Sequence, residues 1–125
     1  MMTEASKQTV LVVDDDFLVR MLAVETLRDC GYEVREAEDG DVALDMLRDD
    51  EDVDLLITDV KMPRMNGYEL AECALSLRPG MKILLMTGYA QESVPAKITQ
   101  AGVDVLYKPF DINRLSERAK ELLAR

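Results

Sequence analysis

The most constraining feature of this chain is a set of short, mostly apolar runs that end at reactive side chains. Residues 10–13 lead into Asp14-Asp15-Asp16, residues 53–58 into Asp59, residues 82–86 into Thr87-Gly88, and residues 103–107 into Lys108-Pro109. In an open parallel sheet the carboxyl ends of the strands meet along one edge, where such sheets bind ligands. We therefore expect acidic groups, a hydroxyl and an ammonium group to converge at one edge of a sheet.

The segments between these runs have helical periodicity. Residues 17–30 carry Leu18, Met21, Leu22 and Leu27 at helical spacing, with Asp16 as a candidate N-cap and Gly31 after the last turn. Helices with one apolar face are also predicted over residues 41–47 (Val42, Ala43, Leu44, Leu47), 68–77 (Leu70, Ala71, Ala74, Leu77) and 112–123 (Ile112, Leu115, Ala119, Leu122, Leu123).

Three further segments complete the pattern. Residues 33–37 form a weak second strand, and residues 63–67 form a loop because of their proline, asparagine and glycine. Pro95 interrupts residues 93–101, where only Val94, Ile98 and Ala101 can pack, which predicts a short, poorly held helix. Strands that alternate with helices indicate an α/β fold of right-handed βαβ units, with a parallel sheet covered on both faces.

Length and composition limit the class of protein. A chain of 125 residues is long enough for one domain with a single core. No apolar run approaches the ~18 residues of a membrane span, so we expect a cytoplasmic protein without membrane contact. The net charge of -10 disfavours binding to nucleic acid phosphates.

Cys30 and Cys73 have no metal-ligand spacing and are expected to be buried, reduced thiols.

The expected strand ends have a definite chemistry. Asp14, Asp15 and Asp59 bring three carboxylates together, and two unit charges ~4 Å apart repel by about 4 kcal/mol at an effective dielectric constant of 20. A hard divalent cation such as Mg²⁺ relieves that repulsion. A carboxylate can also act as the nucleophile of phosphoryl transfer, with Lys108 and Thr87 as a fixed charge and a hydroxyl donor. These residues therefore indicate a phosphoryl and metal site.

In this order, these motifs make the chain resemble a response regulator receiver domain, the phospho-acceptor of two-component signalling, from residue 9 to residue 123. The resemblance implies a flavodoxin-like sheet of five strands in the order 2-1-3-4-5, with five helices. It implies Asp59 as the phosphorylated residue, Asp14, Asp15 and Asp59 as metal ligands together with the backbone carbonyl of Lys61, and Thr87 and Lys108 as the switch hydroxyl and the phosphate-pairing lysine. It also implies a cis bond between Lys108 and Pro109.

The resemblance also implies a function. Asp59 would take a phosphoryl group from a sensor histidine kinase or a histidine phosphotransfer protein of a phosphorelay, with Mg²⁺, and the change would alter the affinity for an unknown downstream protein. Such a protein is no enzyme, apart from at most slow autophosphatase activity. We expect a stand-alone domain over residues 9–125 and a disordered segment over residues 1–8, although a receiver cut from a hybrid kinase would have a similar sequence.

Three positions bear on how this chain would differ from other receivers in its switch and in its reaction rates. Val105 stands three residues before Lys108, where receivers commonly carry an aromatic residue. Lys61 and Tyr89 lie two residues beyond Asp59 and Thr87, at positions that adjust phosphorylation and hydrolysis rates in the family. Tyr107 shares a strand face with Val105, so Tyr107 or Tyr89 is a candidate for the missing aromatic switch, acting through Thr87 on residues 93–101.

Other interpretations of the same residues remain open. Asp15 and Asp16 can simply cap the first helix, Asp59 and Thr87 can be turn residues, and Lys108 a solvated strand end. Asp14-Asp15-Asp16 also fits haloacid dehalogenase-like phosphotransferases, with Asp14 as the nucleophile and Asp16 as the acid/base, but that hypothesis leaves Asp59 unexplained. A third possibility is an interaction module that works without phosphorylation.

Overall fold

The strands form one parallel sheet, as the alternating pattern predicts. The computed structural model describes residues 7–50, 52–88 and 93–125. The five strands are β1 (Thr9–Val13), β2 (Glu33–Ala37), β3 (Val53–Asp59), β4 (Lys82–Thr87) and β5 (Asp104–Tyr107). All neighbouring strands pair in parallel, in the order β2-β1-β3-β4-β5. The predicted doubly wound sheet and its strand order are therefore confirmed.

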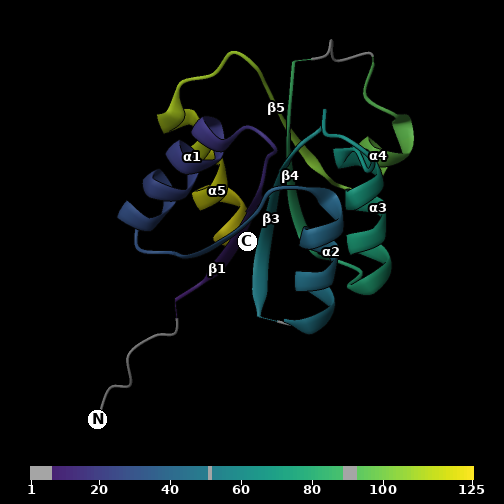
Figure 1. The fold of residues 1–125 in the computed structure, drawn as a ribbon, viewed down its shortest axis with the longest axis horizontal. Coiled ribbons are helices and arrows are strands. Elements are labelled where there is room, and N and C mark those ends of the chain that lie inside the picture. The colour runs from purple at the N-terminus through teal and green to yellow at the C-terminus, as the bar shows by residue number, and fades with distance from the viewer. Residues whose placement is uncertain (1–6, 51, 89–92) are drawn as a thin grey trace.

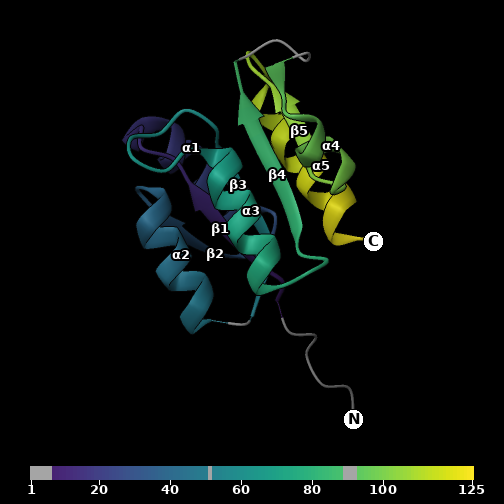
Figure 2. The same ribbon diagram turned by 90° about the vertical axis from the view of Figure 1, so that its right-hand side faces the viewer.

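Helices cover both faces of this sheet. They are α1 (Phe17–Asp29), α2 (Gly40–Asp49), α3 (Gly67–Leu77), α4 (Ala96–Gln100) and α5 (Ile112–Leu123). Figure 1 shows α1 and α5 on one side of the strands and α2, α3 and α4 on the other, and in Figure 2 α2 and α3 lie in front of the sheet. Among the described residues, no helix has the length and apolar character that crossing a bilayer requires.

The central strands are apolar because both of their faces are buried. Side chains alternate between the faces of a strand. In β1, Leu11 and Val13 accordingly pack with the core of α2 and α3, whereas Val10 and Val12 pack with the core of α1 and α5. Each of these four residues is 0% exposed. Continuous apolar runs of this kind are typical of strands in a parallel sheet covered on both sides.

Local caps fix where the helices begin. The Asp16 carboxylate accepts hydrogen bonds from the backbone N–H groups of Leu18 (3.0 Å) and Val19 (3.3 Å), so the predicted N-cap of α1 is confirmed. Asn66 caps α3 in a reciprocal capping box with Glu69. The helix thus starts directly after the loop that follows β3, which fixes the length of that loop.

The predicted helix faces were only partly right. Val42 and Leu77 are 40% and 42% exposed, and Ala101 is also exposed. The core side of α2 is centred on Gly40, Ala43, Leu44 and Leu47, about 150° around the helix from Val42. On α1 the buried residues are Ala23, Val24 and Leu27, whereas Leu18, Met21 and Leu22 face outward.

The cysteine prediction was wrong in one respect. Both thiols are free, but Cys30 is exposed and Cys73 is only partly buried. Cys30 is the C-cap of α1, one residue beyond the last helical turn, and therefore does not share the buried side of that helix.

The last residue of the N-terminal segment expected to be disordered, Gln8, contacts the rest of the fold. Residues 1–6 of the segment expected to be disordered lie outside the described residues. Gln8 is tied down: its backbone carbonyl accepts from Glu33 N at 3.0 Å, and its side-chain amide donates to the backbone carbonyl of Leu123 at 3.0 Å.

Candidate functional site

Four strand ends come together around one cavity at the edge of the sheet. Its volume is about 490 Å³. The residues that line it come from the ends of β1, β3, β4 and β5 and from the start of α1: Asp14, Asp15, Asp16, Val19, Asp59, Lys61, Thr87, Gly88 and Lys108. The sheet register explains the convergence, since Val13 pairs with Thr58, Asp59 with Met86, and Thr87 with Tyr107. The residue types that the sequence placed at strand ends therefore share one site.

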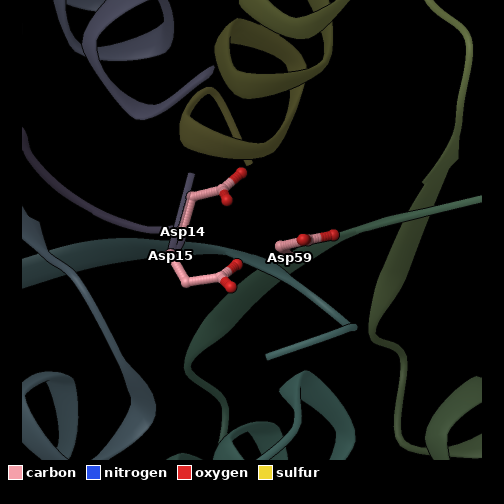
Figure 3. Close-up of side chains that lie close together, drawn as sticks. All are labelled: Asp14, Asp15 and Asp59. Atoms are coloured by element: carbon pink, nitrogen blue, oxygen red, sulfur yellow. The ribbon is translucent and has the colours of Figure 1, made fainter. Parts of the chain in front are cut away.

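Three carboxylates form the acidic part of the cavity. Each of Asp14, Asp15 and Asp59 offers an oxygen, and these oxygens all lie within 4.8 Å of one another. Figure 3 shows the carboxyl groups of Asp14 and Asp15 extending from the end of β1 toward the side on which Asp59 lies. Asp14 and Asp59 are only 1% and 7% exposed, whereas Asp15 is exposed.

The backbone conformation after β1 aims the Asp14 side chain. Its Oδ1 accepts a hydrogen bond from the backbone N–H of Asp16 at 2.9 Å. Its Oδ2 is buried and has no hydrogen-bond partner among the described residues. Burial raises the pKa of Asp14 to about 6; the Asp16 hydrogen bond opposes this shift, and the charge of Asp59 adds to it. A buried carboxylate oxygen without a donor, beside two other carboxylates, fits a hard divalent cation such as Mg²⁺.

Asp59 is held from two directions. Its Oδ1 accepts from Lys108 Nζ at 3.0 Å and from the backbone N–H of Val60 at 3.0 Å. The start of α3 also presses against this strand end, because a Cβ at Gly67 would lie 2.4 Å from the backbone oxygen of Asp59. The acidic side chain at the end of β3 is therefore fixed in place by neighbours on both sides.

Lys108 is positioned by the end of β4. Its backbone N–H donates to the carbonyl of Thr87 at 2.7 Å, and the following peptide bond, Lys108-Pro109, is cis as predicted. Thr87 itself is 1% exposed and lines the cavity. The lysine and the threonine, 21 positions apart in the chain, are thus joined by their backbones.

The remaining predicted site residues are less constrained. Lys61 is exposed and lines the cavity, and the role of its backbone carbonyl as a metal ligand stays a prediction. Tyr107 is partly buried and lies in register with Thr87, whereas Tyr89 lies outside the described residues. The Asp16 carboxylate caps α1, which accounts for this residue without the acid/base role of the haloacid dehalogenase hypothesis.

One residue at the site escaped the sequence analysis. Arg20, on α1, donates from its guanidinium to the backbone carbonyl of Asp14 at 2.7 Å and to Glu36 at 2.9 Å. An arginine one turn into an amphipathic helix has no distinguishing pattern in the sequence, since its partners are a backbone carbonyl and a residue of another strand.

The comparisons with known proteins agree with this geometry. The family described as response regulator receiver domain matches residues 10–120. The response regulator receiver protein CpdR of Brucella abortus is 34% identical over 115 residues, which cover 91% of this chain and 95% of that protein. The sensor kinase CckA of the same organism is 34% identical over 119 residues, or 94% of this chain and 13% of the kinase. The response regulator MprA of Mycobacterium avium is 40% identical over 119 residues, and the chain spans 51% of it.

Solved structures lead to the same comparison. A CheY-like receiver domain protein of Methanospirillum hungatei has a TM-score of 0.87 and 36% identity, with 95% of each chain covered. The receiver domain of the hybrid histidine kinase CckA has a TM-score of 0.77 and 37% identity, with 92% of this chain and 98% of that chain covered. Similarity therefore extends over nearly the whole chain, both to a protein of similar length and to parts of longer ones.

Proposed function

This chain belongs to the response regulator receiver domain family of two-component signalling, and on that premise we propose that Asp59 is the residue that accepts the phosphoryl group. The proposal rests on the environment of Asp59. Its carboxylate is 7% exposed, bonded to Lys108 and grouped with two other carboxylates at a cavity that opens to solvent. Asp14 and Asp15, in contrast, come from the turn that leads into α1.

The transfer itself requires little covalent chemistry from the protein. A carboxylate oxygen of Asp59 attacks phosphorus, the bond from phosphorus to the histidine nitrogen of the donor breaks, and that nitrogen keeps the electron pair and takes up a proton. The product is an aspartyl phosphate. Lys108 stays beside the carboxylate and stabilises the charge on the phosphoryl oxygens, and the Thr87 hydroxyl is the proposed second donor.

Asp14, Asp15 and Asp59, with the backbone carbonyl of Lys61, are the residues that would hold Mg²⁺. The fit rests on the buried Oδ2 of Asp14 and on three carboxylates whose oxygens lie within 4.8 Å of one another. The ion supplies the positive charge that lets three carboxylates and a phosphoryl group occupy one small site.

Hydrolysis of the aspartyl phosphate is proposed to be slow. The chain has no histidine, and the cavity is lined by aspartates, lysines, one threonine, one valine and one glycine. The carboxylates near the phosphoryl group would be occupied as metal ligands, so the described residues that line the cavity leave no strong general base for an attacking water. Lys61, exposed at the rim, is the side chain placed to influence access of that water.

We infer the partners from the same chemistry. The phosphodonor is a sensor histidine kinase or a histidine phosphotransfer protein in the cytoplasm, and the output is a change in affinity for a protein target. With a net charge of -10, the domain should not bind duplex DNA at physiological salt, whether phosphorylated or not. Residues 9–125 are proposed to form the receiver domain, and Gln8, just before it, is hydrogen-bonded to Glu33 and Leu123.

The test is to incubate the protein with a small phosphodonor and Mg²⁺, and to measure the mass of the intact protein and of its peptides. We expect one phosphoryl group on Asp59, no labelling of Asp59→Asn, and loss of labelling when Mg²⁺ is chelated. Asp45→Asn is the matched control, because Asp45 is an exposed aspartate on α2, away from the cavity. Labelling mapped to Asp14, or unchanged labelling of Asp59→Asn, would contradict the proposal.

A further inference from the structure

We propose that Arg20 is a positioning residue for the acidic turn between β1 and α1, and that its guanidinium holds Asp14 and Asp15 in the arrangement that binds a divalent cation. This inference rests on the proposed function, in which Asp14, Asp15 and Asp59 hold Mg²⁺. It adds a residue that lies outside the cavity lining and would act through the backbone.

The guanidinium of Arg20 is nearly buried and has partners on three elements. Its side chain is 12% exposed. One nitrogen, Nη1, donates to the backbone carbonyl of Asp14 at 2.7 Å, and Nε donates to Glu36 of β2 at 2.9 Å. Its Cζ lies 5.6 Å from the centre of the Phe17 ring, within the range of a cation–π contact. The side chain therefore bridges α1, the end of β1 and the neighbouring strand.

These contacts complete the fixation of Asp14. Its backbone N–H donates to the carbonyl of Ala37 at 3.3 Å, its carbonyl accepts from Arg20, and its Oδ1 accepts from the backbone N–H of Asp16. Three of its four hydrogen-bonding groups are thus engaged, and the buried Oδ2, beside Asp15 and Asp59, is the one that has no partner in the described part of the chain.

The link to Arg20 also closes a short ring of interactions. The backbone N–H of Arg20 donates to the carbonyl of Asp16 at 2.9 Å, while its side chain returns to the carbonyl of Asp14. The three-residue turn between these two carbonyls contains Asp15. Without the guanidinium, the carbonyl of Asp14 loses its donor and the turn can rotate, and both metal-binding carboxylates move with it.

A planar guanidinium suits this task better than an ammonium group. Arginine presents donors in a fixed fork, so that Nη1 and Nε can bind two acceptors at the same time, one just after β1 and one on β2. The ammonium group of a lysine is a single point of charge on a flexible stem. Arg20→Lys should therefore retain only part of the effect.

The experiment compares Mg²⁺ affinity and stability in four proteins: the parent, Arg20→Ala, Arg20→Lys and Arg28→Ala. Arg28 is the matched control, since it also lies on α1 and donates to a backbone carbonyl of β2, that of Val34 at 3.1 Å, but at the opposite end of the helix. Calorimetric titration with MgCl₂ gives the affinity, and urea unfolding in EDTA gives the stability.

We expect Arg20→Ala to bind Mg²⁺ at least about ten-fold more weakly, as is usual when an outer group that orients metal ligands is removed. Arg20→Lys should fall between Arg20→Ala and the parent. Arg28→Ala should bind within about two-fold of the parent, even where its loss of stability equals that of Arg20→Ala. The Mg²⁺ affinity would then depend on the turn at residues 14–16 rather than on the general stability of α1.

The outcomes separate the two proposals. A parent that does not bind Mg²⁺ refutes the proposed function itself. If the parent binds and Arg20→Ala binds equally well, or if Arg28→Ala weakens binding as much, then the role assigned to Arg20 is wrong. Should Arg20→Ala not fold, Arg20→Lys decides the question, because parental affinity in that variant would show that the two-acceptor geometry is unnecessary.

Discussion

Replacing Asp14 by asparagine should make the metal-free protein more stable at neutral pH. In the native protein Asp14 is 1% exposed, and its pKa is raised from 3.8 to about 6, first of all by burial. At pH 7.5 the carboxylate is ionised in both the folded and the unfolded chain, but ionisation is less favourable in the fold. A pKa difference of about two units corresponds to roughly 3 kcal/mol of destabilisation.

Because the pKa of Asp14 is raised in the folded state, this residue makes the parent less stable as the pH rises. A carboxyl group whose pKa is higher in the folded state binds its proton more tightly there. Its contribution to stability is fully present below pH 3.8, the ordinary value, and is lost as the pH rises through about 6. The advantage of Asp14→Asn over the parent should therefore grow between about pH 4 and pH 6 and remain constant above pH 7.

The asparagine side chain is compatible with the site. Its carbonyl oxygen can still accept from the backbone N–H of Asp16, as Oδ1 does now at 2.9 Å. Its amide group takes the place of the unpartnered Oδ2 and becomes a donor beside the carboxylates of Asp15 and Asp59. The substitution thus removes a buried charge and provides a donor where only acceptors meet.

The assay is urea unfolding in EDTA, followed by circular dichroism at several pH values. At pH 7.5 we expect Asp14→Asn to be more stable by about 2–3 kcal/mol, a midpoint shift of roughly 1–2 M urea. Mg²⁺ should stabilise the parent and have much less effect on the variant, since a ligand stabilises only the state that binds it. Asp45→Asn is the control for loss of an exposed carboxylate. Equal stability of parent and Asp14→Asn at pH 7.5, or an advantage that does not change with pH, would refute the reasoning.

Three further predictions concern the loop after β3 and the end of β5. Gly67→Ala should destabilise the fold by about 2 kcal/mol in urea unfolding, because the added Cβ would lie 2.4 Å from the backbone oxygen of Asp59. Gly88→Ala should cost far less, because none of the described residues comes within 4 Å of a Cβ there. Arg64 has a φ of 67°, a conformation that glycine adopts freely and alanine does not, and it forms two surface ion pairs of small value. In urea unfolding, Arg64→Gly should therefore be close to neutral and Arg64→Ala should lose about 1 kcal/mol of stability. An alanine variant as stable as the glycine variant would contradict this. Tyr107→Ala should phosphorylate normally but show smaller NMR shift changes in α4 on phosphorylation, and a full parental response would exclude Tyr107 as the switch.

Much of the fold could be predicted because buried strands and capped helices leave local signals. The run over residues 53–58 is mostly apolar since β3 is covered on both faces, and Asp16 marks the start of α1 because the helix needs an acceptor there. The strand order is different. Alternation of strands and helices allows several orders, and the order 2-1-3-4-5 came from the resemblance to receiver domains, which carried information that no single segment contains.

The faces of the helices show where periodicity stops being informative. On α1 the apolar residues Leu18, Met21 and Leu22 repeat at helical spacing and yet face outward, while the smaller Ala23 and Val24 meet the core. A repeat reveals that a helix has an apolar side, but α1 has apolar residues on more than one side. Which of them the sheet covers depends on how α1 packs against the sheet and α5, and the repeat within α1 does not contain that information.

The functional site could likewise be predicted from the sequence only in part. The residue types could be assigned from strand ends, because the carboxyl ends of parallel strands share an edge. The contact between Lys108 and Asp59, 49 positions apart, additionally requires that β3, β4 and β5 be neighbours in the right register. The hydrogen bond from Arg20 to Asp14 required the backbone path of the turn itself, which no residue pattern encodes.

Stability and function are therefore coupled at Asp14. The burial that raises its pKa also leaves its Oδ2 without a donor, so the metal-free site is held at a cost in free energy that a cation can remove. The proposed link to Arg20 fixes the backbone so that this oxygen does not turn toward solvent or toward a local donor. An acidic turn free to relax would bind Mg²⁺ less tightly. By this reasoning, Asp14→Asn should stabilise the metal-free domain and lose Mg²⁺ affinity through the missing ligand. Arg20→Ala should lose both stability and Mg²⁺ affinity, because it removes the hydrogen bonds that orient the ligands.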